Sequence, residues 1–289
     1  MYRLLLISLF ITNTAIATTW TVDDDGPADF TTIQAAIDAA SDGDEIIVMP
    51  GTYTGSGDWV IDLSGKAVWL HSSEGSATTL IDGENARTCI YCNSDETAAT
   101  IIEGFKITNG NGLSGGGMYC WQADPTIRGC TFYGNHWERG GGINCVDSSP
   151  SIESCSFVGN DASSGGGGLY CSTGSTPVLS NCAFTYNTAP YGAGIYCTGS
   201  TTTGSSPVIT DCSFISNSAS KCGGGMYMKQ LGAPTLTDCT FSENTAPIGG
   251  GMYNALECNP NLTGCLFTYN TATNGAALAN SYSDIVLTG

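Results

Sequence analysis

The strongest constraint on this chain is a unit of 25 or 26 residues that recurs from Gly115 onward. Each copy opens on a glycine cluster, and one copy is lengthened to 31 residues by extra residues around Thr198 to Ser206. The opening glycines are Gly115, Gly140, Gly166, Gly192, Gly223, Gly249 and Gly275. A fixed period of this length is typical of solenoids, in which each repeat packs mainly on its neighbours.

Apolar residues recur at fixed places inside the unit and show no helical period of 3.6 residues. One column is Met118, Ile143, Leu169, Ile195, Met226 and Met252, and another is Ile127, Ile152, Leu179, Ile209, Leu236 and Leu262. Because side chains alternate between the two faces of a strand, each column predicts the inward face of a short strand. The pattern predicts an all-β fold, a parallel β-helix of about ten coils with strands stacked roughly 4.8 Å apart.

A cysteine, a phenylalanine and an asparagine also recur at fixed places in each copy, and a second inward cysteine column is Cys120, Cys145, Cys171 and Cys197. The pairs are Cys130/Phe132, Cys155/Phe157, Cys182/Phe184, Cys212/Phe214, Cys239/Phe241 and Cys265/Phe267, and an Asn follows each Phe by three residues. Stacked rungs would place cysteine Cβ atoms nearly 5 Å apart, beyond the ~3.8 Å usual for a disulfide. We therefore expect most of the 14 cysteines to be buried thiols,. Cys89, Cys92, Cys222 and Cys258 are the better disulfide candidates.

A tyrosine column lies between two inward columns and is predicted to point to solvent. Its members are Tyr170, Tyr196, Tyr227 and Tyr253, with Tyr119 beyond Asn144 at the start of the column. A flat aromatic strip suits the faces of sugars or a protein partner. The alternative is stacking between rungs that only stabilises the sheet. Trp137, in a predicted loop from His136 to Arg139, is a further candidate contact, with simple packing over the loop as its alternative.

The beginning of the chain predicts export. Residues 1–17 combine Arg3, an apolar run and a small-residue cleavage site, as in a signal peptide,. Residues 18–289 are predicted to form one β-helix domain, with residues 18–45 as an N-terminal cap and 115–289 as regular coils that break off mid-coil. Thr31 to Ala40 is predicted to be a capping helix, with Thr31 and Gln34 as a capping box. No stretch of the mature chain is predicted to cross a membrane.

The formal net charge of -18 argues against nucleic acid as a partner,. We predict no metal or cofactor, and interpret Asp23 to Asp25 as a solvated turn because the ligand spacing of a known Ca²⁺ loop is missing. The carboxylates Asp124, Glu138, Asp147, Glu153 and Asp161 are the ones that adjacent coils could bring together. A hydrolase needs such a pair across the scissile bond, but we interpret these as solvated loop residues and predict no catalytic residue.

Two resemblances follow from these motifs. Gly116-Gly-Met-Tyr119 with Phe132-Tyr-Gly-Asn135 resembles the repeat of the chlamydial polymorphic outer membrane proteins, which implies an adhesin-like, surface-exposed β-helix. Residues 26–38, with Pro50-Gly-Thr-Tyr53, are similar to the start of pectin methylesterases and other pectin-lyase-like proteins, which implies that fold. The catalytic Asp-Phe-Ile-Phe-Gly segment of the methylesterases has no counterpart here. The three catalytic motifs of the polygalacturonases, which are paired Asp, His and Arg-x-Lys, are also missing.

Taken together, the sequence predicts a right-handed parallel β-helix with a short capping helix. We expect an exported, non-catalytic protein, secreted or on the cell surface or outer membrane, that binds a polysaccharide or a cell-surface protein. One alternative is a polysaccharide lyase or glycoside hydrolase of pectin-lyase-like fold. Another is a structural spacer that presents a C-terminal domain.

Overall fold

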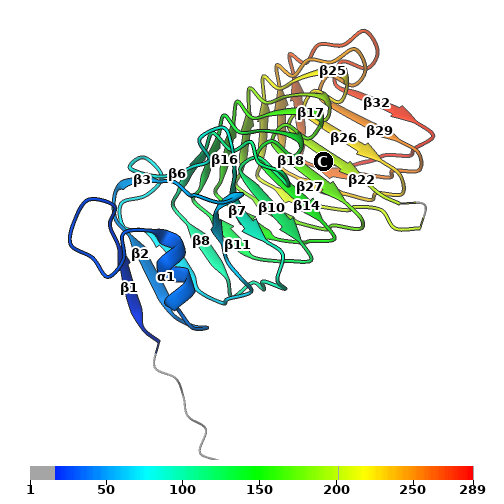
Figure 1. Ribbon diagram of the computed structural model, residues 1–289. Helices are drawn as coiled ribbons and strands as arrows, with labels where there is room; N and C mark the ends of the chain where they lie inside the picture. The colour runs from blue at the N-terminus through cyan, green and yellow to red at the C-terminus, as the bar shows by residue number, and fades with distance from the viewer. Residues whose placement is uncertain (1–16, 201, 289) are drawn as a thin grey trace, which may run out of the picture.

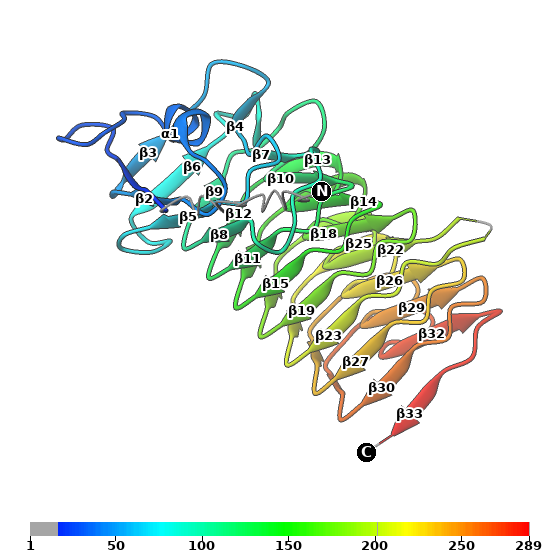
Figure 2. The same cartoon turned by 90° about the horizontal axis from the view of Figure 1, so that it is seen from below.

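A computed structural model describes residues 17–200 and 202–288. The chain winds into an elongated right-handed stack of parallel coils, as predicted, with the first strands at one end and the last at the other (Figure 1). The predicted signal peptide, residues 1–17, lies outside the described residues except for Ala17. The strands of successive coils lie side by side along three faces of the stack (Figure 2).

Three long sheets, here called A, B and C, form these faces. Sheet A contains β1 (Thr19–Val22), β2 (Glu45–Val48), β5 (Trp69–Ser72), β8 (Ile101–Glu103), β11 (Thr126–Arg128), β15 (Ser151–Glu153), β19 (Val178–Ser180), β23 (Val208–Thr210), β27 (Thr235–Thr237), β30 (Asn261–Thr263) and β33 (Val286–Thr288). Sheet B contains β3 (Gly51–Tyr53), β6 (Thr79–Asp82), β9 (Lys106–Thr108), β12 (Thr131–Tyr133), β16 (Ser156–Val158), β20 (Ala183–Thr185), β24 (Ser213–Ile215), β28 (Thr240–Ser242) and β31 (Leu266–Thr268). Sheet C contains β4 (Trp59–Asp62), β7 (Thr88–Cys92), β10 (Met118–Trp121), β14 (Ile143–Val146), β18 (Leu169–Ser172), β22 (Ile195–Thr198), β26 (Met226–Lys229), β29 (Met252–Ala255) and β32 (Leu278–Ser281).

A fourth, smaller sheet, D, was not predicted. It contains β13 (His136–Arg139), β17 (Asp161–Gly165), β21 (Thr188–Tyr191) and β25 (Ser218–Cys222). The segment from His136 to Arg139 is therefore a strand, and its prediction as a loop was wrong. Sheet D covers a separate small core of buried alanines, which are Ala162, Ala189, Ala193, Ala219 and Ala246. Alanine has a small apolar side chain, so a column of alanines is a weak sequence signal for the buried face of a strand.

The predicted columns form the interior of the stack. The rings of Phe132, Phe157, Phe184, Phe214, Phe241 and Phe267 are fully or partly buried and stack with centroids 4.4–5.0 Å apart. The asparagines that follow each Phe by three residues form a hydrogen-bonded ladder. Each amide donates to the next asparagine Oδ1 at 2.9–3.1 Å, from Asn135 through Asn270. A buried amide is tolerated only when its donors and acceptors are satisfied, and the ladder does this rung by rung.

From Gly140 onward, the opening glycine of each copy has a positive φ and fits a turn that other residues would strain. Gly223 has a φ of 66°, and a Cβ atom at this position would lie 2.8 Å from the Cβ of Tyr227. Both the left-handed backbone and the close approach exclude a side chain. The turn brings the chain from sheet D into sheet C, so it fixes how the two sheets meet.

The described residues contain one helix, α1 (Ile33–Ala39). It lies over the N-terminal end of the stack (Figure 1). It is shorter than predicted, and its cap differs. The Thr32 hydroxyl, not that of Thr31, accepts the Ala35 N–H at 3.3 Å. Gln34 does not close a capping box, because its amide bonds to the backbone of Asp62 and the carboxylate of Asp38. Ile33, with Ala36 and Ile37, is buried against the coils.

All 14 cysteines are free thiols, and 12 of them are buried. The two inward cysteine columns confirm the expectation of packed thiols. Cys92 extends one of them, because it pairs in register with Cys120. The four better disulfide candidates are unbonded, so that part of the prediction was wrong. Burial raises the pKa of the Cys92 thiol, as expected when a thiolate would have to form away from water,.

Candidate functional site

An aromatic column runs along the outer face of sheet C. Going from one coil to the next, the register aligns Tyr91, Tyr119, Asn144, Tyr170, Tyr196, Tyr227 and Tyr253. The column therefore has two aromatic stretches, separated by the one asparagine. The second stretch was predicted from the sequence as a solvent-facing strip, and the first was recognised only in part.

The second stretch is more covered than predicted. Tyr170 and Tyr227 are only 6% and 7% exposed, and Tyr196 and Tyr253 are partly buried. Burial raises the pKa of Tyr196 to about 12. The prediction that this column points freely to solvent was therefore wrong for Tyr170 and Tyr227.

Sheet D explains the burial. The Arg139 guanidinium carbon lies 5.8 Å from the centre of the Tyr170 ring, and the Tyr191 ring lies 5.6 Å from that of Tyr227. Tyr196 and Tyr227 stack at 4.9 Å with an angle of 9° between their planes. Rings that are covered from the side and stacked on each other leave little surface for a ligand. This stretch is best explained as packing between sheets C and D.

Trp137 also has a structural role. It is the register partner of Ala162, whose side chain is buried in the small core beneath sheet D. Trp137 is itself partly buried at the start of this alanine column. The packing alternative thus accounts for its position, while its neighbours His136 and Asp161 point outward and bond to each other at 2.7 Å.

The first aromatic stretch begins at a cleft. The cleft has a volume of about 580 Å³ and lies between the start of α1, the loop after β3 and strand β4. Trp59 lines it, and its ring stacks on that of Tyr91 at 4.3 Å and 6°. Tyr91 stacks in turn on Tyr119 at 5.5 Å. Trp121 lies two residues further along β10 on the same face, and 43% of its surface is exposed,.

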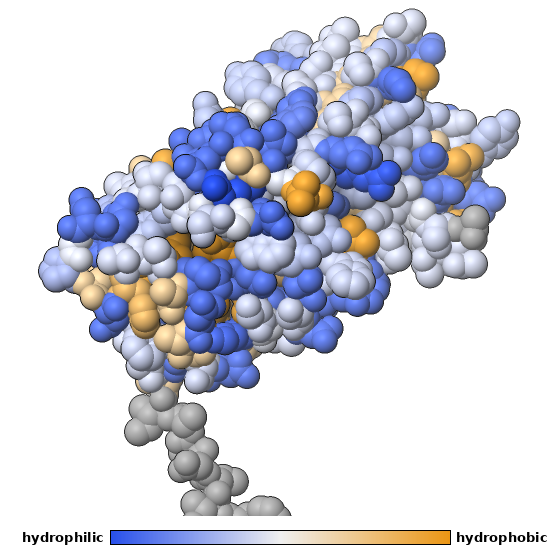
Figure 3. Space-filling view, viewed as in Figure 1, coloured by the Kyte–Doolittle hydropathy of each residue, from blue (hydrophilic) through white to orange (hydrophobic). Residues whose placement is uncertain are grey.

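The other groups that line the cleft are mainly uncharged and polar. The polar lining is Thr32, Gln34, Thr54, Ser56, Ser64 and the backbone of Gly55 and Gly57, and Ile33, Tyr53, Val60 and Ile61 complete it with Asp62, the one charged lining residue in the described chain. Gln34 is held in place, because its Oε1 accepts the Asp62 N–H at 2.7 Å. In Figure 3, the largest group of apolar side chains on the visible face gathers at this end of the stack.

The cleft was not predicted, because its lining comes from three segments that are separate in the sequence. The only signal was the aromatic residue Trp59 beside a helix of the N-terminal cap. An indole next to hydroxyl and amide groups can hold the apolar face of a sugar while the polar groups bond to its hydroxyls.

The five carboxylates considered for catalysis do not converge. Glu138 and Asp161 lie on sheet D and Glu153 on sheet A, while Asp124 and Asp147 lie in turns after strands of sheet C. All five already have protein partners, and Glu153 accepts from the Ser151 hydroxyl at 3.3 Å. Asp161 bonds to His136 and to Thr188, Glu138 pairs with Arg139, Asp147 accepts from Gln122, and Asp124 accepts the Ser149 N–H.

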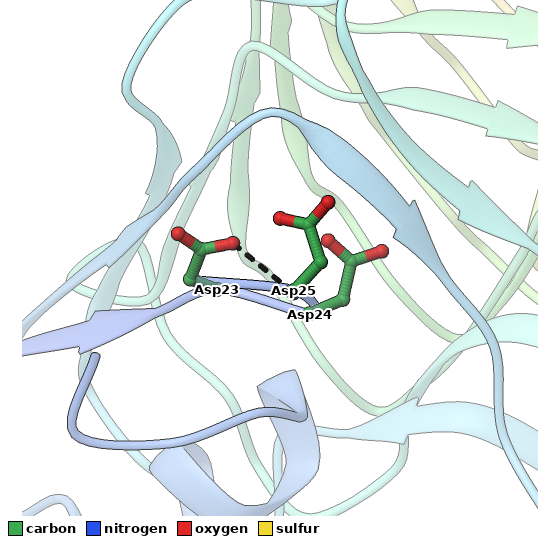
Figure 4. A group of neighbouring side chains, drawn as sticks. All are labelled: Asp23, Asp24 and Asp25. Carbon is green, nitrogen blue, oxygen red and sulfur yellow. Dashed lines mark hydrogen bonds between the residues drawn. The ribbon is translucent and has the colours of Figure 1, made fainter. Parts of the chain in front are cut away.

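The three aspartates of the N-terminal turn lie close together. One carboxylate oxygen from each of Asp23, Asp24 and Asp25 falls within 4.8 Å of the others (Figure 4). Two of these groups are used by the turn itself. Asp23 accepts the Asp25 N–H at 3.3 Å, and Asp24 accepts the Thr52 N–H at 3.1 Å. A solvated turn accounts for the cluster, and we assign it no further role.

Three parallel sheets wound around one core define the protein as a parallel β-solenoid. More narrowly, the family described as "Right handed beta helix region" matches residues 67–220, and the chain belongs to this family. Among solved structures, that of the pectate lyase Pel9A is similar with a TM-score of 0.58 and 13% identity, covering 93% of this chain and 77% of that one. At this identity the likeness shows the fold alone.

The structure of a pectin methylesterase from carrot has 13% identity and a TM-score of 0.42, covering 92% of this chain and 82% of that one. This similarity is too low to support any conclusion. No curated protein matches the chain. The described residues include no helix with the length and hydropathy needed to span a bilayer.

Proposed function

We propose that this protein is an exported, non-catalytic binding protein whose ligand is a neutral polysaccharide. The observation that carries the proposal is the cleft beside Trp59 and its continuation along the stacked rings of Tyr91 and Tyr119. Trp59 ends this stack of rings and lines the cleft, so the side of its indole that faces away from Tyr91 can support a sugar unit, and the edges of the Tyr91 and Tyr119 rings would continue the apolar surface,. The exposed Trp121 would extend this surface.

The charge distribution favours a neutral ligand. Among the described residues that line the cleft, only Asp62 is charged, and the whole chain carries a formal charge of -18. A polyanionic glycan would be repelled by this field and would find no cation in the cleft. This separates the proposal from a uronate-degrading lyase, which needs a base near the carbohydrate carboxylate.

The remaining parts of the proposal rest on sequence. Export depends on residues 1–17 acting as a signal peptide, and residues 18–289 are taken as one domain with its cap in 18–45. A surface or adhesin-like setting is supported by the resemblance to the chlamydial repeats. A spacer role needs no ligand, so the binding experiment below separates it from the proposal.

Binding of purified residues 18–289 to an array of neutral and acidic glycans tests the proposal, followed by a product assay on any glycan that binds. We expect binding to a neutral polysaccharide without bond cleavage. Replacing Trp59 with Ala should weaken it about tenfold or more, equivalent to ~1.4 kcal/mol. Tyr133→Ala is the matched control, because Tyr133 is 48% exposed on sheet B, away from the cleft.

Two results would overturn the proposal. Cleavage of the bound glycan would show an enzyme, and equal binding by the Trp59→Ala protein would remove the cleft as the site. A chain that binds no glycan at all would favour the spacer role instead.

A further inference from the structure

A second aromatic cluster lies on the outer face of sheet A, away from the cleft. Trp69 and His71 come from β5, Glu103 from β8 and Arg128 from β11, which are neighbours in the sheet. The inward residues between them, Leu70, Ile102 and Ile127, are fully buried. The outward side chains are therefore free of the packing that forms the core.

The indole of Trp69 is held in one orientation. Its Nε1 donates to Glu103 Oε2 at 2.8 Å, and the same carboxylate oxygen accepts from Arg128 Nη2 at 2.8 Å. The ring stacks on that of His71 at 4.3 Å and 25°. His71 Nε2 in turn lies 3.0 Å from Glu45 Oε1. Four adjacent coils thus fix the plane of one tryptophan.

This fixed indole remains accessible, since 37% of its surface is exposed. A ring held by hydrogen bonds and stacking loses little conformational freedom when a ligand covers it, which favours binding. The guanidinium carbon of Arg128 lies 5.8 Å from the ring centre, so its donors border the indole. Opposite charges are paired within the cluster, which gives a polar rim without a strong net charge.

We propose that Trp69, with His71, Glu103 and Arg128 around it, is a second sugar-binding platform, so that one molecule holds two polysaccharide segments. The ligand class is taken from the proposed function of the cleft, and to that extent the inference rests on it. The cleft borders strand β4 of sheet C, whereas the platform lies on sheet A. Two sites on different faces of a solenoid can bind two chains or raise the avidity for one.

Calorimetric titration with cellohexaose, xylohexaose and mannohexaose tests the inference on residues 18–289. We expect two sites for the oligosaccharide that binds, one site in Trp69→Ala, one in Trp59→Ala and none in the double variant. Tyr133→Ala is the control and should keep both sites. Circular dichroism of each variant checks that the fold is retained.

The same variants separate this inference from the proposed function. A single site lost only in Trp59→Ala would overturn the second platform and leave the cleft intact. A single site lost only in Trp69→Ala would support the platform and overturn the cleft. As a second readout, the unaltered protein should cross-link the matching long soluble polysaccharide and raise light scattering, while either single variant should not. Equal scattering by Trp69→Ala would also overturn the inference.

Discussion

The early and the late coils build the same fold from different side chains. All five tryptophans precede residue 140, and both histidines and the cleft lie in the same half. The continuous phenylalanine and asparagine ladders belong to the later coils, from Phe132 to Asn270. On the outer face of sheet A, the early coils present Trp69 and Arg128, whereas the later ones present mainly valine, serine and threonine.

This difference indicates a division of tasks along the stack. Where each coil repeats its neighbour, identical side chains stack and satisfy one another, which stabilises the solenoid. Where the coils are irregular, unlike residues meet across rungs, as Trp69 and Glu103 do, and such places can offer a binding site. Three predictions test this comparison, from the largest expected effect to the smallest.

The first prediction places most of the stability in the regular coils. Phe214 is fully buried and stacks on Phe184 at 5.0 Å and Phe241 at 4.4 Å. Replacing it with Ala should lower the free energy of unfolding by about 3–5 kcal/mol, because a cavity opens in the ladder. Trp69→Ala should cost less than about 1 kcal/mol, since that ring lies outside the core. Urea unfolding followed by circular dichroism measures both, and equal losses would contradict the division.

The second prediction concerns the thiols. Only Cys222 and Cys265 are partly exposed, so a thiol reagent should label these two in the folded protein and all 14 in urea. Cys265 should react first near pH 7.5, because a hydrogen bond from Cys239 lowers its pKa to about 7,. Burial raises the pKa of Cys222.

Mass spectrometry of labelled peptides identifies the modified sites. Labelling of Cys92 or Cys120 in the folded protein would show that the cysteine column opens. A missing label on Cys89 or Cys92 in urea without reductant would instead reveal a disulfide.

The third prediction is a pH effect at the platform. Burial acts to raise the pKa of the Glu103 carboxyl, but the hydrogen bonds from Arg128 and Trp69 outweigh it and hold the pKa below its usual range. The bonds to the carboxylate are complete above the usual value of about 4.3 and are lost as the pH falls through the lowered pKa. Sugar binding by Trp59→Ala, which keeps only the platform, should therefore fall a few-fold as the pH drops from about 5 to below about 4.

Glu103→Gln in the same background is the control for this effect. The amide still accepts from Trp69 but no longer titrates, and the neighbouring groups Glu45 and His71 are unchanged. The step below pH 4 should disappear in this variant. A step that persists would assign the titration to another group.

Repetition made the regular coils predictable. The phenylalanine, cysteine and asparagine columns appear in the sequence at fixed spacing. When successive coils stack directly on one another, equivalent residues of neighbouring repeats must lie side by side. The register of Cys120 with Cys145 and the asparagine ladder follow directly.

The sites were less predictable, for two physical reasons. The burial of Tyr170 and Tyr227 depends on sheet D, whose inward residues are alanines that give little sequence signal. The cleft and most of the platform depend on side chains from the irregular coils before Gly115, where no repeat fixes the register, and Arg128 is the one platform residue from a regular copy. Arg128 and Trp69 are 59 positions apart in the sequence, yet they lie two coils apart on one face.

The one-dimensional stacking of coils has an evolutionary consequence. The cleft and the platform are built from the first coils, and each later coil contacts mainly the coils directly above and below it. Duplication or loss of whole 25- or 26-residue units among the later coils would change the length of the body by about 4.8 Å each,. It would leave Trp59 and Trp69 at a constant separation, so repeat number can vary between relatives while the two proposed binding sites are inherited unchanged.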